Sequence, residues 1–481
     1  MAKNLSGKGA QDFASMRQVL QPDVNFDIVE RELLIGGKQA YFYDINGFVS
    51  DENVQKIIQF FLGVKAEQMP SDPELFLEGF TAFGDVKLEK EVEKLVTAVL
   101  SGLGALIIDG FDQGFVFDIR NYPSRGVQEP DKDRVLRGSR DGFSETIISN
   151  TALIRRRIRD PKLRLEIYQA GQASKTDIAL IYMEGRVDEP LLAKIQNRIQ
   201  NLKVDALTMN QESLAECLYT HKWYNPFPKF KYTERPDTAA ACLLEGNLVI
   251  LVDNSPAAMI LPSSVFDIAE APDDYYFPPI TGTYLRLTRI LTALVALFLI
   301  PIYLLLMQNT HWLPEWLDFI RPAENVNVPL IFQILILELA VDGLRLASVN
   351  TPSMLSTPLS IIAGIVMGDF SVQSGWFNSE IMLYMAFVTV ANYTQTSYEL
   401  GYAIKFLRLS LVILTSLFNV WGFAAGMALV LVAIVTNRTI AGTSYLYPLI
   451  PFRWREVKNR FFRPRLSHEI DGKKQNKNGA K

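Results

Sequence analysis

The chain has 481 residues, with 48 Lys and Arg against 52 Asp and Glu, so its formal net charge is −4. This balance argues against nucleic acid as a partner. Two cysteines, Cys217 and Cys242, cannot build a disulfide framework, and three scattered histidines argue against a metal site or a His-based catalytic site. The sequence has no phosphate-binding loop and no dinucleotide fingerprint, so we predict neither an enzyme nor a cofactor.

The N-terminus, "MAKNLSGKGAQDFASM", has no apolar core and does not resemble a secretory signal. We therefore expect residues 1–25 to be a flexible segment. We also expect the first half of the chain to stay in the cytoplasm.

Residues 26–275 alternate strand-like and helix-like segments. "RELLIGGKQAYFYDING" predicts a hairpin that turns at Gly36-Gly37, and "GALIIDGFDQGFVFDI" predicts a second hairpin. Between them, "SDENVQKIIQFFLG" has the cap and the apolar spacing of a helix. The pattern indicates an α/β domain.

Two pairs of segments resemble each other within this region. Residues 42–57 align with 180–195, placing Gly47 against Gly185. Residues 100–117 align with 244–261, placing Asp109 against Asp253. The repeat predicts two related α/β subdomains, at 26–122 and 149–275, joined by a polar linker at 123–148; chance similarity is the alternative, because strand–turn–helix patterns are common.

The sequence changes from a mixed polar and apolar composition to long apolar segments after Arg289. Residues 291–308 contain no charged side chain. The length of this segment is close to the roughly 20 apolar residues that a helix needs to cross a bilayer. Further apolar runs follow at 328–346, 358–368, 381–393 and 403–436, and the last is too long for one crossing. Asn419 and Gly422 in "FNVWGF" predict a tight turn inside it. We therefore expect an all-α membrane bundle of about six helices at 276–440.

The basic residues predict the orientation of this bundle. The loops on the side of the N-terminal half hold Arg286, Arg289, Arg345, Lys405, Arg408 and Arg438, whereas the opposite loops hold only Arg321. By the positive-inside rule, the N-terminal half and the tail at 441–481 lie in the cytoplasm. The tail is basic and suits an anionic lipid surface.

A few charged residues fall at membrane depth. Glu338, Asp342 and Arg345 follow at i, i+4 and i+7 and share one helical face. We predict that Glu338 faces a pore or cavity; the alternative is a structural ion pair, with Arg345 as its partner. Asp342 and Arg345 are pore candidates or an interfacial ion pair at the helix end. Glu399 is a further pore candidate, or a loop carboxylate near Lys405 and Arg408.

Three segments carry a resemblance to a known family: "SNTALIRRRIRDPKL" (149–163), "NPFPKFKYTERPDTAAACLLEGNLVILVDNSPAAMILP" (225–262) and "EAPDDYY" (270–276). They resemble the spore germination protein A-subunit (GerA) family. "LFLIPIYLLL", "TSYELG" and "SYLYPLIPFRWREVKN" are most similar to its stage V sporulation AF branch. The family motif comprises Glu234, Arg235, Pro236, Asp237, Asp253, Ser255 and Pro256, expected to serve structure or interaction.

The resemblance implies an integral protein of the spore inner membrane that acts in germination. It implies a subunit of an ion channel whose copies assemble around a pore, together with companion membrane subunits. The alternative is a non-conducting scaffold that assembles partners through its cytoplasmic domain. A secondary transporter and a membrane-anchored enzyme are more distant alternatives.

Overall fold

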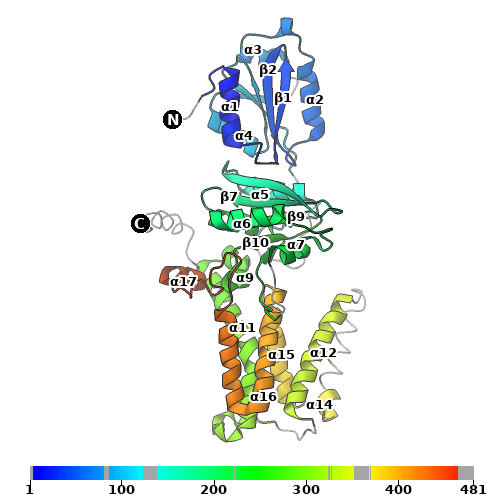
Figure 1. The fold of residues 1–481 in the computed structure, drawn as a ribbon, viewed down its shortest axis with the longest axis vertical. Helices are drawn as coiled ribbons and strands as arrows, with labels where there is room; N and C mark the ends of the chain where they lie inside the picture. Colours follow the sequence, from blue (N-terminus) through cyan, green and yellow to red (C-terminus); the bar gives the residue numbers. More distant parts are fainter. Residues whose placement is uncertain are drawn as a thin grey trace. The chain divides into compact units, whose positions relative to one another are not determined.

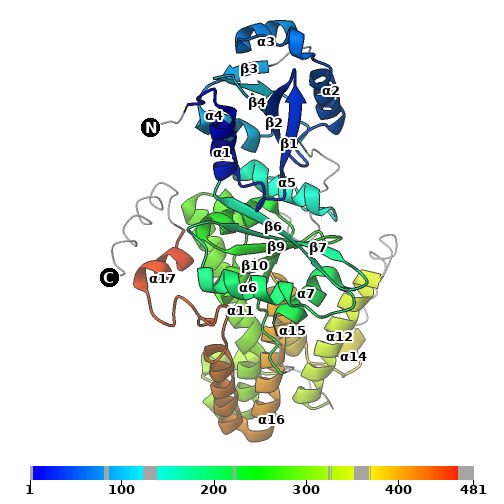
Figure 2. The ribbon, with the colours of Figure 1, turned by 45° about the horizontal axis from the view of Figure 1, so that its top comes forward.

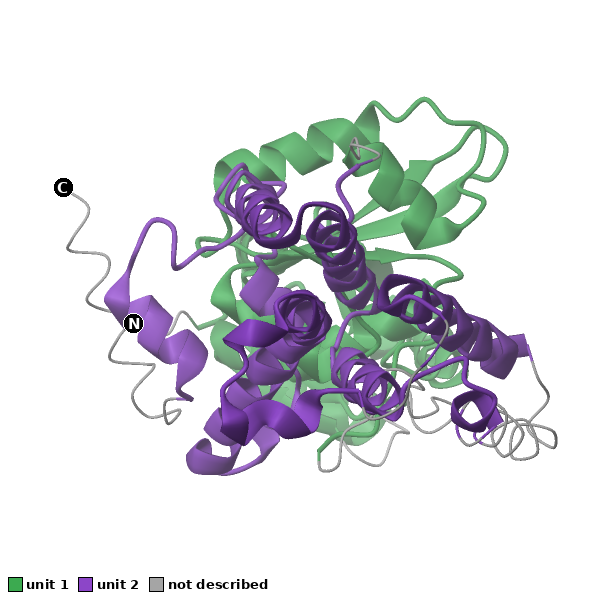
Figure 3. Ribbon diagram, turned by 90° about the horizontal axis from the view of Figure 1, so that it is seen from below, with its two compact units in different colours: residues 1–221, 230–262 green, residues 222–229, 263–481 purple. Residues whose placement is uncertain are grey.

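The structure is a computed structural model that describes residues 4–80, 86–122, 138–219, 224–322, 326, 328–350, 364, 368 and 370–463. The chain forms two compact units, coloured separately in Figure 3. Unit 1 comprises Met1–His221 and Phe230–Pro262, and unit 2 comprises Lys222–Lys229 and Ser263–Lys481.

The first half of unit 1 is a five-stranded antiparallel sheet with helices on both faces. Its strands lie in the order β1-β2-β4-β5-β3. Its elements are α1 (Gly9–Leu20), β1 (Ile28–Ile35), β2 (Lys38–Ile45), α2 (Asp51–Leu62), η1 (Ala66–Gln68), α3 (Pro73–Phe80), β3 (Val86–Glu89), α4 (Val92–Leu100), β4 (Gly104–Ile108) and β5 (Gly114–Phe117). One core lies between the sheet and α1 and α4, and a phenylalanine-rich core lies on the face of α2 and α3. Both predicted hairpins and the helix after the first are confirmed.

Helix α1 corrects the expectation that residues 1–25 are a flexible segment. Its apolar residues Phe13, Met16 and Leu20 recur at i, i+3 and i+7 and are buried in the first core. This short stripe needs the sheet to pack against, so the sequence interpretation missed it.

The second half of unit 1 repeats this architecture (Figure 2). Its strands lie in the order β6-β7-β9-β10-β8, which is the same order as in the first sheet. Its elements are α5 (Ile147–Arg157), β6 (Leu163–Ala170), β7 (Thr176–Met183), α6 (Glu189–Gln200), α7 (Asn210–Leu218), β8 (Lys231–Thr233), α8 (Pro236–Glu245), β9 (Leu248–Val252) and β10 (Ala258–Leu261). The prediction of two related subdomains is confirmed; most of the proposed linker, 123–137, lies outside the described residues.

The two copies share backbone details at the positions that the sequence aligned. Gly102 and Gly246 follow α4 and α8 with φ of +86° and +103°, a conformation that favours glycine. A Cβ on Gly246 would lie 2.6 Å from the carbonyl oxygen of Arg186, so the site also excludes a side chain sterically.

The aligned aspartates also have equivalent contacts. Asp109 accepts a hydrogen bond from the backbone N–H of Gly9 at 2.7 Å, and Asp253 accepts one from Ile147 at 3.2 Å. Each carboxylate therefore satisfies an amide at the first residue of a helix, α1 in one copy and α5 in the other.

A buried ion pair joins the two subdomains of unit 1. Arg155 on α5 donates to both carboxylate oxygens of Asp27, at 2.7 and 3.1 Å. The backbone amide of Leu165 on β6 donates to Asn25 at 3.0 Å. The segment before β1 is therefore held against the second subdomain by side-chain and backbone contacts.

Unit 2 is predominantly helical. Its elements are α9 (Val265–Ala269), α10 (Asp273–Tyr276), α11 (Pro279–Gln308), η2 (Thr310–Trp312), η3 (Glu315–Ile320), α12 (Leu330–Asn350), α14 (Ser371–Gln373), α15 (Ser379–Tyr393), α16 (Tyr398–Val435) and α17 (Trp454–Phe461). Helix α11 packs against α15 and α16 (Figure 1). Their buried apolar residues form two cores along α11.

Helix α16 is a hairpin of two helical arms. The backbone of Asn419 is non-helical, with φ 52° and ψ −127°. A Cβ on Gly426 would lie 2.3 Å from Leu411 Cδ1, so the arms at 398–418 and 420–435 pack against each other. Asn419 also exchanges side-chain hydrogen bonds with Asn309, at the end of α11, at 2.5 and 3.1 Å. The predicted turn in "FNVWGF" is confirmed.

The segment at 224–229 belongs to unit 2, although the sequence analysis placed it in the second subdomain. Lys229 is buried and donates to the side chain of Asn437 and, at 2.7 Å, to the carbonyl oxygen of Arg438. Burial lowers the pKa of Lys229 to about 8. Tyr445 donates to the carbonyl oxygen of Pro228 at 2.9 Å. These contacts hold the segment against the chain that follows α16.

Among the described residues, two helical segments are long and apolar enough by length and composition to cross a membrane: α11 and the 38-residue α16, which folds back at Asn419. The expectation of about six crossings is not confirmed. Helix α12 carries three charged residues, α15 has 15 residues, and most of the expected crossing at 358–368 lies outside the described residues.

Candidate functional site

Four charged residues meet between α12 and the first arm of α16. Glu338 and Asp342 lie one turn apart on α12, and Lys405 and Arg408 lie three residues apart on α16. Each pair therefore occupies one face of its helix. We call these four residues the charge cluster.

Arg408 and Glu338 form the buried centre of the charge cluster. Arg408 Nη2 and Nε lie 2.7 and 2.8 Å from Glu338 Oε1, and the two side chains are 3% and 5% exposed. Arg408 Nη1 also donates to the carbonyl oxygen of Ala296 on α11 at 2.6 Å. One guanidinium therefore joins three helices.

Lys405 extends the cluster along α12. Its Nζ lies 3.2 Å from Glu338 Oε2 and 2.5 Å from Asp342 Oδ2. The side chain of Asp342 is 31% exposed, so the cluster runs from a buried pair to a partly open carboxylate. Two carboxylates face two cations, and the formal charges cancel.

This pairing bears directly on the two interpretations of Glu338. The structural interpretation needed a buried cation, and the sequence offered only Arg345. The structure supplies Lys405 and Arg408, which the sequence analysis had assigned to loops; they lie within α16 and are buried. The observed contacts favour the structural interpretation, while pore access for Glu338 stays a prediction.

Arg345 lies outside the charge cluster. Its guanidinium lies over the rings of Tyr393, Tyr398 and Tyr402, with distances of 5.6, 4.5 and 5.0 Å to the ring centroids. Such cation–π contacts stabilise an arginine without a carboxylate. Glu399, in the first turn of α16, is exposed and is not one of the residues of the cluster.

The family-motif residues lie in unit 1, where Arg235 organises the start of α8. Its side chain is fully buried, donates to Asp237 at 2.6 and 3.1 Å, and donates to the carbonyl oxygen of Ser139 at 2.8 Å. Pro236 stands at the first helical position, where its missing N–H costs no intrahelical bond. The carbonyl oxygen of Glu234 accepts from Phe143 at 2.8 Å.

The remaining motif residues form the turn between β9 and β10. Asp253 contacts the start of α5, the buried hydroxyl of Ser255 donates to Gln211, and Pro256 is exposed. The motif thus contributes to two local structures of the second subdomain, and its role in interaction stays a prediction.

A signal for the missed partners is present in the sequence. "YAIKFLRLSLVIL" places Lys405 and Arg408 at i and i+3 within an apolar run, and α12 places two acids at i and i+4. Opposite charges with matching helical spacing in two apolar segments predict a buried pairing. Among the described residues, no group of three or more His, Cys, Asp or Glu is arranged to hold a metal ion.

The comparisons with known proteins cover nearly the whole chain. Residues 14–474 match the family model described as Bacillus/Clostridium GerA spore germination protein. The chain is 35% identical to stage V sporulation protein AF of Bacillus subtilis (strain 168), over 90% of this chain and 88% of that protein. It is 31% identical to the uncharacterized membrane protein YfkQ of the same organism, over 91% of this chain and 85% of that protein.

A solved structure is also similar to part of the chain. It is the N-terminal domain of the A subunit of the Bacillus megaterium spore germinant receptor GerK3, with a TM-score of 0.43 and 26% identity over 55% of this chain and 97% of that one. The family match and the similarity to stage V sporulation protein AF confirm the resemblance seen in the motif segments: the chain belongs to the GerA family of spore germination proteins.

Proposed function

We propose that this protein is an A-type subunit of a germination assembly in the spore inner membrane. Several copies assemble with each other and with companion membrane subunits, and ions leave the spore through the assembly. The N-terminal unit and the basic tail lie on the cytoplasmic side, which is supported by Arg286, Arg289 and Arg438 on that side against Arg321 on the other, after the buried Lys405 and Arg408 are left out of the count.

The partly open end of the charge cluster, Asp342, is the observation that carries the proposal. Charged side chains within apolar helices are expensive and commonly mark an ion path. Here the two carboxylates, the lysine and the arginine neutralise one another, which reduces that cost. Asp342, the partly open end of the cluster, is the carboxylate best placed to meet passing cations.

The outer face of α12 supports assembly in a bilayer. Phe332, Ile336, Leu339 and Leu346 are exposed and recur at i, i+4, i+7 and i+14. They form one apolar stripe on the helix. In the proposed assembly this stripe contacts lipid or a neighbouring subunit, and α12 lines part of the path with its polar side.

A non-conducting scaffold is the second candidate. Both carboxylate oxygens of Glu338 are ion-paired within one chain, to Lys405 and Arg408. In a scaffold, these ion pairs would hold three helices together and would have no role in conduction. Unit 1, with two related α/β subdomains, would then organise partners at the membrane.

Reconstitution of the purified full chain into liposomes tests the two candidates. A channel-forming subunit should release entrapped K⁺ at a rate that rises with protein per vesicle, above the rate of protein-free vesicles. Sizing in detergent reports assembly separately. An assembled protein without ion release would replace the channel proposal with the scaffold.

A further inference from the structure

Helix α17 has one continuous exposed face. The exposed positions of the helix and of its C-cap residue recur at i, i+1, i+4, i+5 and i+8, which places them on one side: Trp454, Arg455, Lys458, Asn459 and Phe462. Trp454 and Phe462 are 68% and 54% exposed, so both large rings lie outside the core. The face therefore combines two aromatic residues with two cations and contains no acid.

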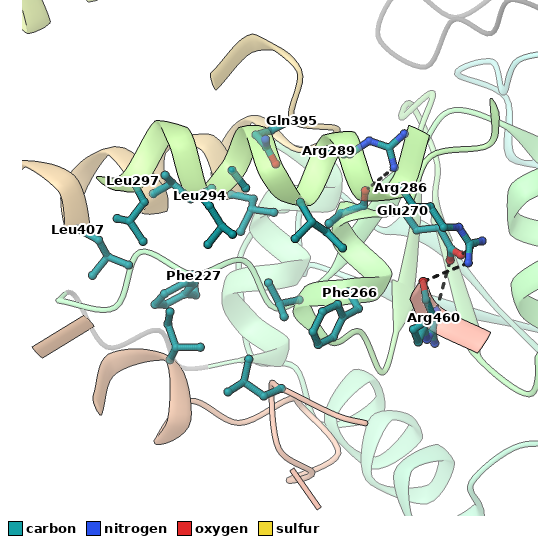
Figure 4. Close-up of a pocket in the computed structure, with 18 of the residues that line it drawn as sticks. Phe227, Phe266, Glu270, Arg286, Arg289, Leu294, Leu297, Gln395, Leu407 and Arg460 are labelled. Carbon is teal, nitrogen blue, oxygen red and sulfur yellow. Dashed lines mark hydrogen bonds and ion pairs between the residues drawn. The ribbon is translucent and has the colours of Figure 1, made fainter. Parts of the chain in front are cut away.

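The opposite face of α17 packs against α9 and the residue that follows it. The ring of Phe461 lies 5.8 Å from the ring of Phe266. Arg460 pairs with Asp267 and Glu270, and Figure 4 shows the side chain of Arg460 beside that of Glu270. These contacts fix which face of the helix points away from the rest of unit 2.

Helix α11 holds the backbone of α17 at a defined level. Arg286 Nη1 donates to the carbonyl oxygens of Asn459 and Arg460, at 3.1 and 3.3 Å. The hydroxyl oxygen of Thr283 accepts from the amide of Arg463 at 3.1 Å. Both α11 residues lie within about two turns before its charge-free run. Helix α17 is therefore fixed beside α11 at the point where the membrane-length apolar segment begins.

The other end of that run is followed by exposed aromatic residues. The 19 residues of 290–308 rise about 28 Å as a helix, close to the hydrocarbon thickness of a bilayer. Directly after them, Trp312, Trp316 and Phe319 are exposed. Aromatic residues are enriched at both membrane–water interfaces. The run of α11 thus matches the hydrocarbon region in length, with aromatic side chains at each of its two boundaries.

The two cations of the exposed face have no acidic partner within the described residues. The ion pairs of this segment are made by Arg453, with Glu456, and by Arg460. Arg455 and Lys458 make none in the part of the chain that the structure describes. A basic residue at a bilayer surface is attracted to anionic lipids, and each one raises the binding constant about fivefold.

We propose that α17 is an interfacial anchor that lies along the bilayer surface. Trp454 and Phe462 insert at the level of the lipid headgroups, and Arg455 and Lys458 contact the phosphates of anionic lipids. A helix with aromatic and basic residues on one face is suited to this position. The inference rests on the membrane location in the proposed function and is independent of ion conduction.

Fluorescence quenching in bilayers that contain the full chain tests the proposal. Asn459→Cys, with Cys217→Ala and Cys242→Ala, attaches a fluorophore to the exposed face and leaves its aromatic residues and cations in place. The bilayers contain phosphatidylcholine, phosphatidylglycerol and a spin-labelled lipid. For a helix inserted at headgroup level, a spin label high on the acyl chain should quench at least about twofold more than a label near the chain end.

Two other positions calibrate the depth of this probe. Leu294→Cys places the fluorophore on the exposed side of the charge-free run of α11 and should give the reverse order of quenching. Lys56→Cys places it on α2 of unit 1, where neither labelled lipid should quench it.

Substitutions in the face separate its aromatic and charged parts. Trp454→Ala should lower the quenching of the Asn459→Cys probe by the shallow label. Trp316→Ala, which removes an exposed tryptophan at the other end of α11, is the matched control and should leave it unchanged. Arg455→Gln with Lys458→Gln should lower the quenching in bilayers that contain phosphatidylglycerol and not in pure phosphatidylcholine.

The proposal is overturned if aqueous iodide quenches the Asn459→Cys probe as strongly as the Lys56→Cys probe while the labelled lipids do not. That result would leave the face to a companion protein. Equal effects of Trp454→Ala and Trp316→Ala, or no effect of the paired glutamine substitutions, would also contradict it. Absent lipid quenching at Leu294→Cys would contradict the membrane location of unit 2, whereas its absence at Asn459→Cys alone contradicts only the anchor.

Discussion

Both units bury an arginine against a carboxylate, and the surroundings of the two pairs differ. In unit 1, Arg155 and Asp27 are 0% and 2% exposed and stand where two subdomains join, and a spare guanidinium donor meets the carbonyl oxygen of Leu163 at 3.3 Å. In unit 2, the pair of Arg408 and Glu338 continues through Lys405 to Asp342, which is partly open. The pair in unit 1 is fully buried and joins two subdomains, whereas the pair in unit 2 is the buried end of the charge cluster.

Loss of the buried carboxylate in unit 2 should have the largest effect. Glu338→Gln leaves Arg408 without its carboxylate, and removing one partner of a buried pair costs about 3–5 kcal/mol. We expect less assembled protein in the membrane, measured by quantitative blotting and by sizing in detergent.

Glu399→Gln is the matched control, because this exposed carboxylate lies in the first turn of α16. It should change the amount of assembled protein little. Normal assembly of Glu338→Gln together with reduced ion flux would instead support the pore-facing interpretation of Glu338.

Asp27→Asn should weaken the join inside unit 1, by about 3 kcal/mol, because Arg155 keeps its charge while its partner becomes neutral. Hydrogen exchange at the amides of α5 in the full chain measures this loss. Asp23→Asn is the control: Asp23 forms a solvent-exposed pair with Arg17, and such pairs contribute little to stability because water screens them. Equal exchange rates in both variants would show that the subdomains do not depend on the buried pair.

A pH dependence should distinguish another buried acid of unit 1, Asp44. Burial raises the pKa of Asp44 to about 6 from its ordinary 3.8, partly offset by Arg31 and reinforced by Asp51. The folded state therefore favours the protonated acid, and this contribution to stability is lost as the pH rises from about 4 to about 6.

Asp44→Asn should remove this contribution to the pH dependence and stabilise β2 at neutral pH by at most about 3 kcal/mol. Hydrogen exchange of β2 amides in the full chain, measured between pH 4 and 7, follows the effect. A wild type and a variant with parallel pH profiles would contradict the raised pKa.

Asp342→Asn should have the smallest effect on stability, at most about 1 kcal/mol, because the carboxylate is partly solvated. In the proposed channel it should nevertheless slow cation release from liposomes at unchanged protein content. An unchanged rate of cation release would remove Asp342 from the ion path and leave the charge cluster as a structural feature.

The sequence could predict features that depend on neighbours along the chain. Gly47, Gly102, Gly185 and Gly246 marked the repeat because their backbones need positive φ, and Asn419 marked the hairpin turn of α16 because few residues tolerate that backbone conformation. Half of the charge cluster, Glu338 and Asp342, was visible from helical spacing. Lys405 and Arg408 were not identified as partners, because a positive-inside count assigns isolated basic residues to loops.

The amino-acid sequence by itself determined the α/β repeat, the apolar segments and membership of the family, since each depends on local pattern or on direct similarity. Only the tertiary structure decided which charges neutralise one another. Glu338 and Arg408 are 70 residues apart, and no local pattern records the packing that brings them within 2.8 Å. Helix α1 also depended on the tertiary structure. Its apolar stripe is too short to predict a helix by itself, and the helix is stabilised because the sheet buries that stripe in the core.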